Sequence, residues 1–368
     1  LAACGTSAPA ACSFNTAPVG AGPFVVETFV PGQELVLRRN ETYWAGPPLL
    51  ERLRFISMQD SGGERTLAAL DNGEADVAFL RDPATVVTAK SVGRAGHSVV
   101  IEAGSVTLMN NGAWVTCTAG EPAVHCAGRP DGQFRTTPPT SRADVRTAIA
   151  AAIEPIAIDR EVTGGSGHAT TALLSSAFTG LPPVPGPVHD VARAKALMDA
   201  VKAETGWDGR LRYRCTNTDA NRARARVLRE QLAAIGIELV LDVDGGTDEQ
   251  VQALTVRDFD LACWGLQVTP DELGADSLRQ NLYAMLGTNR SGYESAEMNA
   301  ALDALRLATD PASKQAAFRQ IATLYARDVP FVVDAAIEEY VAWDADVEGV
   351  TPGLGSVVHF DRAWLRSA

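Results

Sequence analysis

Alternating apolar and polar residues near the start of the chain predict short, half-buried β-strands. Val25–Phe29 and Glu34–Arg38 are rich in strand-forming residues and flank Pro31-Gly32, which is typical of a tight turn, so we expect a hairpin there. The other elements expected before residue 111 are a helix at Gly62–Asn72, a strand at Val77–Leu80, and a strand pair at His97–Glu102 and Ser105–Asn110.

Residues 111–140 are rich in Gly, Pro and Thr and are expected to form a loop, whereas the apolar spacing after residue 141 indicates helices. A helix is expected to begin at Ser141, because Ser141 and Asp144 resemble a capping box, and Pro155 should kink or interrupt it. Val191–Glu204 carries its apolar residues on one stripe and predicts an amphipathic helix.

Strand and helix patterns alternate between residues 211 and 265. Three expected strands separated by two expected helices form a βαβαβ unit, which predicts a parallel sheet with right-handed crossovers. The strands are Leu211–Cys215, Ile237–Asp242 and Asp260–Gly265, and the helices are Ala220–Ile235 and Thr247–Val256. Helices at Ala296–Thr309 and Pro311–Arg327, and strands at Phe331–Asp334 and Tyr340–Trp343, are expected to follow.

Trp264 is the main candidate for a ligand contact in this unit. Open parallel sheets bind ligands outside the carboxyl ends of their strands, and Trp264 lies at that end of the third strand, before Gly265 and a polar loop. A core aromatic residue is the alternative interpretation. Asn110 and Asn111 follow another expected strand, where they either lie near the same cleft or only form a turn.

Composition and charge exclude several classes of protein. The 368 residues are 46% hydrophobic, which is enough for two cores, and no stretch approaches the ~20 apolar residues that cross a bilayer. A net charge of −13 argues against nucleic acid as a partner, because phosphate backbones are bound by basic patches. The one dense basic cluster is interpreted as a solvated helix face, and it comprises Arg222, Arg224, Arg226 and Arg229.

The six cysteines indicate disulfides and therefore a location outside the cytoplasm. Two pairs of cysteines lie close together in loops, Cys4 with Cys12 and Cys117 with Cys126, and each pair is interpreted as a disulfide that closes a short loop. Cys215 and Cys263 lie on expected strands of one unit, so they are bridged only if those strands are neighbours, and otherwise they are buried apolar residues. Without a CxxC motif, and with scattered histidines, no metal site is expected.

The sequence Leu1–Cys4 reads Leu-Ala-Ala-Cys and looks like a bacterial lipoprotein processing site. A lipid on Cys4 would deprive Cys12 of its partner, and the residues themselves favour the disulfide. The protein is expected to be extracytoplasmic, in the periplasm or cell wall. If Cys4 is lipidated, the protein is anchored to the outer face of the cytoplasmic membrane.

No motif of a known catalytic type is present. The chain lacks a GxSxG elbow, an HExxH motif and a Walker loop, and its one glycine-rich run, Gly164–His168, follows an expected helix rather than a strand. We therefore expect a protein that is not an enzyme and that carries no cofactor.

The block Pro18–Phe24 reads PVGAGPF and is followed by Pro31-Gly32-Gln33, Arg39-Asn40 and Tyr43-Trp44. It resembles the signature of the peptide/nickel/opine family of extracellular solute-binding proteins. Further matches occur in the family's order: Gly73-Glu74-Ala75-Asp76, Asp144-Val145-Arg146 with Asp159-Arg160, Phe259-Asp260 with Trp264-Gly265, Tyr293 with Met298-Asn299, and Arg327-Asp328-Val329-Pro330.

The resemblance implies an α/β fold of the two-lobed periplasmic-binding-protein type (type II, large peptide-binding class), with parallel or mixed sheets and a hinge. Lobe I would comprise residues 1–108, continued by 335–368, and lobe II residues 109–334. Family members carry a long segment before the PVGAGPF block, so the sequence is expected to lack the family's N-terminal segment and to hold only part of lobe I.

The implied function is that of a monomeric substrate-binding protein of an ABC importer, which captures peptides or a related solute by hinge closure and docks onto the permease subunits. The alternative is a cell-envelope lipoprotein of the same fold with a regulatory or scaffold role and no transport. A hydrolase is a third, less favoured hypothesis.

One departure from the family bears on the ligand. In peptide-binding relatives the loop after the Trp strand has a second Trp and then an Asp that pairs with the peptide's ammonium group. Those positions hold Leu266 and Thr269 here, and the nearest carboxylate is Asp271. Since a buried ammonium needs an ionised partner, either Asp271 substitutes or the ligand has no free amino terminus. The expected ligand contacts are Trp264, Asn110, Asn111, Thr269 and Asp271.

Overall fold

The computed structural model describes residues 18–58, 63–118, 125–175, 183–270, 272–284 and 288–366. Cys4, Cys12, the Leu1–Cys4 sequence and Asp271 lie outside these residues. The chain divides into two compact units. The smaller comprises the residues up to Val99 together with those from Glu339 onward, and the larger comprises Val100–Glu338.

The smaller unit contains a three-stranded antiparallel sheet. β1 (Phe24–Val30) and β2 (Glu34–Arg39) form the expected hairpin, and β3 (Arg52–Ile56) pairs with β2. α2 (Glu64–Asp71) and β4 (Val77–Leu80) also confirm the sequence pattern. Short strands near the end of the chain form two antiparallel pairs, β13 (Val347–Glu348) with β16 (Trp364–Leu365) and β14 (Thr351–Pro352) with β15 (Val358–His359).

A further helix of this unit, α3 (Pro83–Ser91), is not predicted by the apolar pattern, although its start signal is present. The Asp82 carboxylate accepts hydrogen bonds from the backbone N–H groups of Ala84 and Thr85, at 3.0 and 3.1 Å. Proline at the first helical position costs no hydrogen bond there. The helix buries Val86 in the core of the smaller unit.

The larger unit contains most of a mixed sheet with the strand order β10-β9-β11-β5-β12-β4. β9 (Arg210–Arg214) pairs in parallel with both β10 (Glu238–Asp242) and β11 (Leu261–Trp264), so the expected parallel βαβαβ unit is confirmed. β11 pairs antiparallel with β5 (Ala95–Met109). β12 (Phe331–Trp343) and β5 each carry residues of both units.

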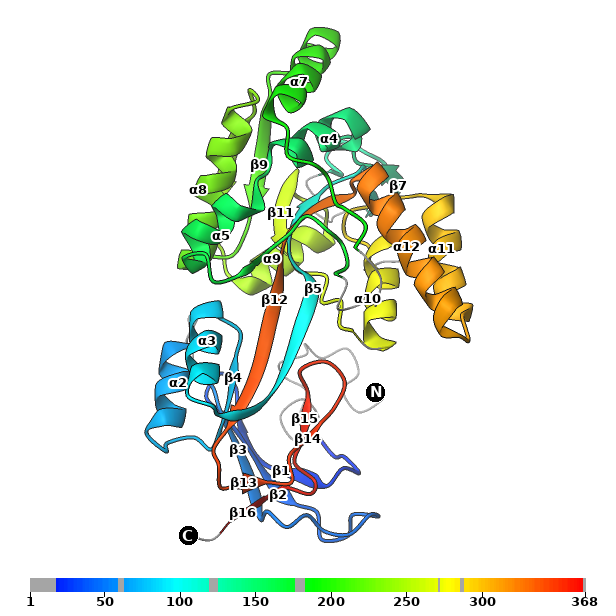
Figure 1. The fold of residues 1–368 in the computed structure, drawn as a ribbon. Coiled ribbons are helices and arrows are strands. Elements are labelled where there is room, and N and C mark those ends of the chain that lie inside the picture. Colours follow the sequence, from blue (N-terminus) through cyan, green and yellow to red (C-terminus); the bar gives the residue numbers. More distant parts are fainter. Residues whose placement is uncertain are drawn as a thin grey trace. The chain divides into compact units, whose positions relative to one another are not determined.

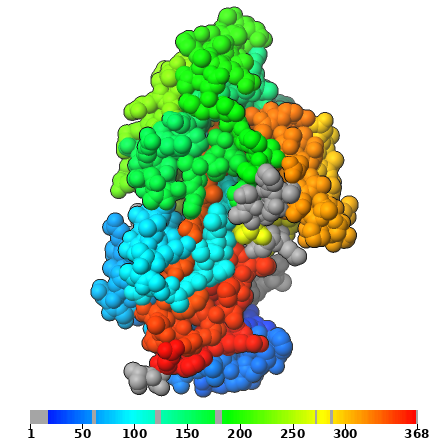
Figure 2. All heavy atoms as spheres, in the orientation of Figure 1, coloured from blue at the N-terminus to red at the C-terminus, as the bar shows by residue number. Residues whose placement is uncertain are grey.

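Helices cover this sheet on both faces. On the side of β9 and β10 they are α4 (Ala143–Ala152), α5 (Pro155–Thr163), α7 (Val191–Thr205) and α8 (Asp219–Ala233). The others are α9 (Thr247–Thr255), α10 (Glu272–Leu282), which the sequence pattern misses, α11 (Ala296–Leu307) and α12 (Pro311–Asp328). α11 and α12 pack side by side (Figure 1), and their residues form one continuous surface in the space-filling view (Figure 2). None of the described helices is long and apolar enough to cross a membrane.

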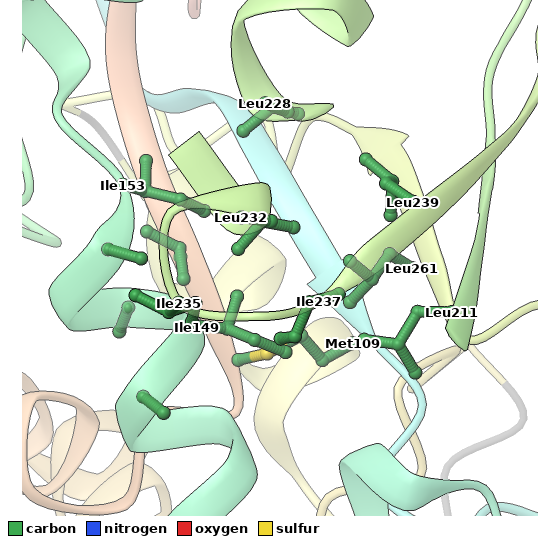
Figure 3. Close-up of a cluster of buried hydrophobic side chains, with 14 of the residues drawn as sticks. Met109, Ile149, Ile153, Leu211, Leu228, Leu232, Ile235, Ile237, Leu239 and Leu261 are labelled. Atoms are coloured by element: carbon green, nitrogen blue, oxygen red, sulfur yellow. The ribbon is translucent and has the colours of Figure 1, made fainter. Parts of the chain in front are cut away.

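The sheet of the larger unit lies between two hydrophobic cores. Successive residues of one strand point to opposite faces, and accordingly Met109 and Leu261 enter one core while their neighbours Leu108 and Ala262 enter the other. The first core packs α4 and α8 onto β9 and β10 (Figure 3). This layering suits the central strand β11, whose residues Leu261, Ala262 and Cys263 are all apolar, whereas β9 alternates between arginine and apolar residues.

Two expected breaks in strands are wrong. β5 is one continuous strand although Ala103-Gly104 suggests a turn, and β12 is continuous although Glu338-Glu339 interrupts its apolar run. Ala103 has a φ of 47° inside the strand. Gly104 lies where a Cβ would come within 2.8 Å of the Ile337 side chain, so the glycine permits close packing of β12 instead of a turn.

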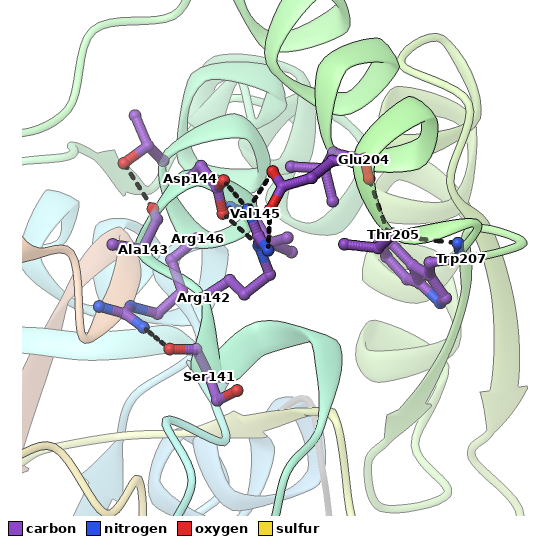
Figure 4. Close-up of polar contacts among 11 residues, drawn as sticks. Ser141, Arg142, Ala143, Asp144, Val145, Arg146, Glu204, Thr205 and Trp207 are labelled. Carbon is purple, nitrogen blue, oxygen red and sulfur yellow. Dashed lines mark hydrogen bonds and ion pairs between the residues drawn. The ribbon is translucent and has the colours of Figure 1, made fainter.

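The expected helix start at Ser141 is also wrong. Ser141 ends a short 3-10 turn, η2 (Pro139–Ser141), and α4 begins at Ala143 with no side-chain cap. The Asp144 carboxylate binds the Arg142 guanidinium at 2.7 Å, and Arg142 also binds Glu204 of α7 at 2.9 Å, which joins the two helices (Figure 4). The expected interruption at Pro155 is confirmed, because α5 begins there.

The expected loop at 111–140 contains a disulfide-clipped hairpin. β6 (Trp114–Cys117) pairs with β7 (Gly132–Arg135), and Cys117 is bonded to Cys126 as the sequence predicts. Cys215 and Cys263 are also bonded, with their Cα atoms 5.2 Å apart, because β9 and β11 are neighbours. Of the two alternatives for Cys215 and Cys263, the disulfide is confirmed and the pair of free buried cysteines is not.

One member of the basic cluster is not solvated. Arg224 is buried with 4% exposure, on the same stripe of α8 as the core residue Leu228 four positions later. It forms an ion pair with Asp334 of β12. It also donates to the Tyr213 hydroxyl at 2.8 Å and to the Thr107 hydroxyl at 3.0 Å. The interpretation as a solvated face is wrong for Arg224, whereas Arg226 and Arg229 are exposed.

Candidate ligand-binding site

Trp264 is the last residue of β11 and pairs with Val106 of β5. Its ring is half-buried against the second core, and the Arg290 guanidinium lies 5.1 Å from the ring centroid, within cation–π range. Arg290 is fixed there by a 2.9 Å bond from Nη1 to the Thr255 hydroxyl. The indole therefore has a defined orientation and keeps part of its surface accessible.

Main-chain contacts hold the loop after Trp264 against β5. A Cβ on Gly265 would lie 2.5 Å from the Gly104 carbonyl, so only glycine fits. Leu266 donates its N–H to the Ala103 carbonyl at 2.9 Å, and Val268 exchanges backbone hydrogen bonds with Glu102. This ladder places Thr269, which is 8% exposed, at the end of the loop.

Glu102 is a buried carboxyl group beneath this loop that the sequence analysis misses. It is 2% exposed and accepts a hydrogen bond from the Ser175 hydroxyl. Burial raises the pKa of Glu102, against the lowering effects of Ser175 and of nearby His168, which itself lies 3.7 Å from Glu338. The signal in the sequence is a single acid between the apolar residues Ile101 and Ala103.

The raised pKa of Glu102 predicts a pH-dependent cost to stability. Because the folded protein binds this proton more tightly than the unfolded chain, stability falls as the pH rises from the unfolded value, about 4.3, through the raised folded value. We expect Glu102→Gln to gain free energy of unfolding relative to the wild type between about pH 4 and pH 7. Urea denaturation at both values measures this, with exposed Glu161→Gln as the control. An equal difference at both values would contradict it.

The Asn110 side chain is buried and joins several segments of the backbone by hydrogen bonds. It is fully buried, and its amide group donates to the Phe259 and Arg257 carbonyls at 3.1 and 3.4 Å. Its side-chain oxygen accepts three further bonds, from Gly112 N, Ala113 N and the Thr136 hydroxyl, all at 3.1 Å. Its hydrogen-bonding capacity is thus used within the protein.

Asn111 is 8% exposed and donates to the Met109 and Pro330 carbonyls at 2.9 and 2.8 Å. Its buried side-chain oxygen has no partner among the described residues. Because Met109 pairs with Leu261, both asparagines lie at the amino end of β11, whereas Trp264 lies at the carboxyl end. The structure therefore does not bring the two asparagines together with Trp264, since the two ends of β11 are about 10 Å apart.

The carboxyl ends of β9 and β10 border a separate polar hollow of about 540 Å3 beside α9. Arg214, Asp242 and Gln250 line it, and Arg214 pairs with Asp242 at 2.5 Å. Trp264 and Thr269 thus lie at the two ends of one loop, which pairs with Glu102 through Val268. In the part of the chain that the structure describes, no three metal-ligating side chains come together.

Residues 7–285 match the family described as bacterial extracellular solute-binding proteins, family 5 Middle. Protein XP55 of Streptomyces lividans is 25% identical over 341 residues, which cover 86% of this chain and 55% of that protein. Oligopeptide-binding protein AppA of Bacillus subtilis is 23% identical, covering 90% of this chain and 59% of AppA. The chain thus spans less than three fifths of the length of either relative.

Solved structures share the fold. The structure of the B. subtilis AppA in complex with a nonapeptide superposes with a TM-score of 0.67 at 19% identity, covering 95% of this chain and 67% of AppA. AgaA from A. tumefacien R10 in complex with agropinic acid gives 0.69 at 21% identity, covering 96% and 69%. The periplasmic oligopeptide-binding protein OppAIV from Borrelia burgdorferi gives 0.72 at 16% identity, covering 96% and 67%.

Proposed function

Because the chain belongs to the bacterial extracellular solute-binding proteins of family 5, we propose that it is the ligand-capturing component of an ABC importer. It binds a peptide or a related solute outside the cytoplasm and releases it chemically unaltered to permease subunits. The observation that carries the proposal is the match across residues 7–285, together with a fixed aromatic ring at the carboxyl end of β11.

Capture by hinge closure is part of this proposal. β5 and β12 each carry residues of both units, so changes in backbone dihedrals within these two strands would move one unit as a rigid body. We keep residues 1–108 with 335–368 as lobe I and 109–334 as lobe II. The protein acts as a monomer without enzymatic activity.

Trp264, Thr269 and Asp271 are the proposed ligand contacts. AppA of B. subtilis binds a nonapeptide and AgaA binds agropinic acid, so solutes of either kind belong in a first panel. Thr269 cannot supply an ionised partner to an ammonium group. The proposal therefore leaves two ligand classes: peptides that pair with Asp271, and solutes without a free amino terminus.

A thermal-shift panel of dipeptides, oligopeptides, opines and neutral sugars tests the proposal. A ligand at 100 times its Kd stabilises the folded protein by about 2.7 kcal/mol and raises its Tm. We expect Trp264→Ala to weaken binding by about 2 kcal/mol, or roughly 30-fold. Trp207→Ala, which removes a half-buried indole from the other core, is the matched control and should retain the Kd.

Two results would contradict the proposal. An unchanged Kd in Trp264→Ala would place the ligand elsewhere. If no solute raises the Tm, the proposal of solute capture is wrong, and a second candidate function is favoured.

That second candidate is a lipid-anchored envelope protein on the outer face of the cytoplasmic membrane with a regulatory or scaffold role. The observation that favours it is the clipped hairpin of β6 and β7, and capture of an envelope protein would test it.

A further inference from the structure

The clipped hairpin has two unlike faces. Val115, Phe134 and the Cys117–Cys126 bond share one face and form a small core of their own. The opposite face carries Trp114 and Gln133, because residues alternate along each strand and Trp114 pairs with Arg135. The disulfide and the small core thus hold the hairpin together through its first face.

The second face borders a hollow of about 440 Å3 against the start of α11, within the size range of small-ligand sites. Trp114, Gln133, Glu294 and Asn299 line it, and none of them is among the contacts proposed for the transported solute. Trp114 is 42% exposed, so part of its ring is accessible to a ligand although the hairpin that carries it is clipped by a disulfide.

The charges at this hollow are already neutralised. The Glu294 carboxylate accepts a hydrogen bond from the Trp114 indole N–H at 2.9 Å and pairs with Arg135 at 3.3 Å. The Arg135 guanidinium lies 5.7 Å from the Trp114 ring centroid. A charged ligand would therefore meet no uncompensated partner, and a neutral one is favoured.

Hydrogen-bonding groups remain around the ring. Asn299 uses its side-chain oxygen to accept from Ala284 N at 2.9 Å, while its amide N–H2 has no partner among the described residues. The Gln133 side chain likewise makes no hydrogen bond within the described part of the chain, and each Glu294 oxygen keeps a free lone pair.

From this juxtaposition we propose that the hollow is a second ligand site, which binds a neutral saccharide ring. The apolar C–H face of a sugar packs on an indole, and its hydroxyl groups both donate and accept. Carboxylate and amide groups around one exposed tryptophan suit that combination. A proline-rich peptide, by contrast, is bound in grooves lined by several aromatic side chains, and among the described residues that line this hollow Trp114 is the one aromatic side chain. The site would tether the larger unit to glycan chains.

The inference does not depend on the proposed function and is tested on the whole protein. The indole N–H resonance of Trp114 is followed by NMR while the tetrasaccharides of N-acetylglucosamine, cellulose and starch are added separately, up to about 10 mM, ten times a Kd of 1 mM. At least one should shift this resonance saturably. Calorimetric titration, which does not depend on the indole signal, should then show that Trp114→Ala binds that saccharide about tenfold or more weakly.

Matched variants distinguish binding from folding. Trp44→Ala removes another exposed indole, from the smaller unit, and should leave the sugar affinity unchanged. Trp114→Phe keeps an aromatic ring and should retain part of the sugar affinity. An unchanged thermal midpoint in Trp114→Ala would show that this variant still folds. No shift with any saccharide, or a shift with a proline-rich peptide instead, would overturn the proposal.

Discussion

Replacing Asp334 by alanine is expected to lower the free energy of unfolding by about 3–5 kcal/mol, because it leaves the Arg224 guanidinium buried without its counter-charge. The exposed fractions of the two side chains are 5% for Arg224 and 1% for Asp334. Burial raises the pKa of the neighbouring Tyr213 to about 12, which keeps its hydroxyl neutral and unable to replace the lost carboxylate. Urea denaturation monitored by tryptophan fluorescence measures the loss.

A control on the same helix separates this effect from ordinary surface electrostatics. Arg226 pairs with Glu161 at 3.2 Å with both side chains about half exposed, so Arg226→Ala should cost no more than about 1 kcal/mol. The double variant Arg224→Met, Asp334→Leu removes both charges and should recover much of the stability lost by Asp334→Ala. A loss below 1 kcal/mol in Asp334→Ala would contradict the buried ion pair.

The second large effect concerns the disulfides. Cys215 and Cys263 are separated by 48 residues and Cys117 and Cys126 by 9, so loop-closure entropy predicts losses of about 4 and about 3 kcal/mol on removing each bond. We expect Cys215→Ala, Cys263→Ala to be the less stable double variant. It should also bind solute more weakly, since Cys263 directly precedes Trp264.

Denaturation and ligand-binding measurements on both double variants check the predicted losses of stability and of solute affinity. The Cys117→Ala, Cys126→Ala variant should keep its solute affinity, because the hairpin carries none of the proposed solute contacts. A reversed order of stabilities would contradict the entropic argument. An unchanged solute affinity in the Cys215, Cys263 variant would show that the bond does not position Trp264.

The parts of the fold that follow from local pattern could be predicted. The βαβαβ unit can be predicted because its strands are short segments with alternating or continuous apolar residues and its helices carry a regular apolar stripe. β5 and β12 could not be read as continuous, because a strand that contains Ala103-Gly104 or Glu338-Glu339 is held together by pairing with distant partners. Helix α3 could have been predicted, because Asp82-Pro83 is a helix start signal that the sequence contains.

The candidate site divides in the same way. Trp264 could be placed at a strand end from sequence alone, and the structure puts it there. Asn110 and Asn111 have the composition of ligand contacts, yet their side chains bind carbonyl groups, as at Phe259 and Pro330, that lie well over a hundred residues further along the chain. Arg224 reads as a surface residue for a similar reason, because its partner Asp334 is remote in sequence.

The central claim is capture without chemistry, and the fate of a bound solute tests it most directly. The purified protein is incubated with the solute that raises its Tm most, freed of unbound solute, and denatured, and the released compound is weighed by mass spectrometry. The account predicts about one equivalent of solute per chain with its mass unchanged, and a strongly reduced yield from Trp264→Ala. Recovery of a cleaved or modified compound, or equal yields from both proteins, would contradict it.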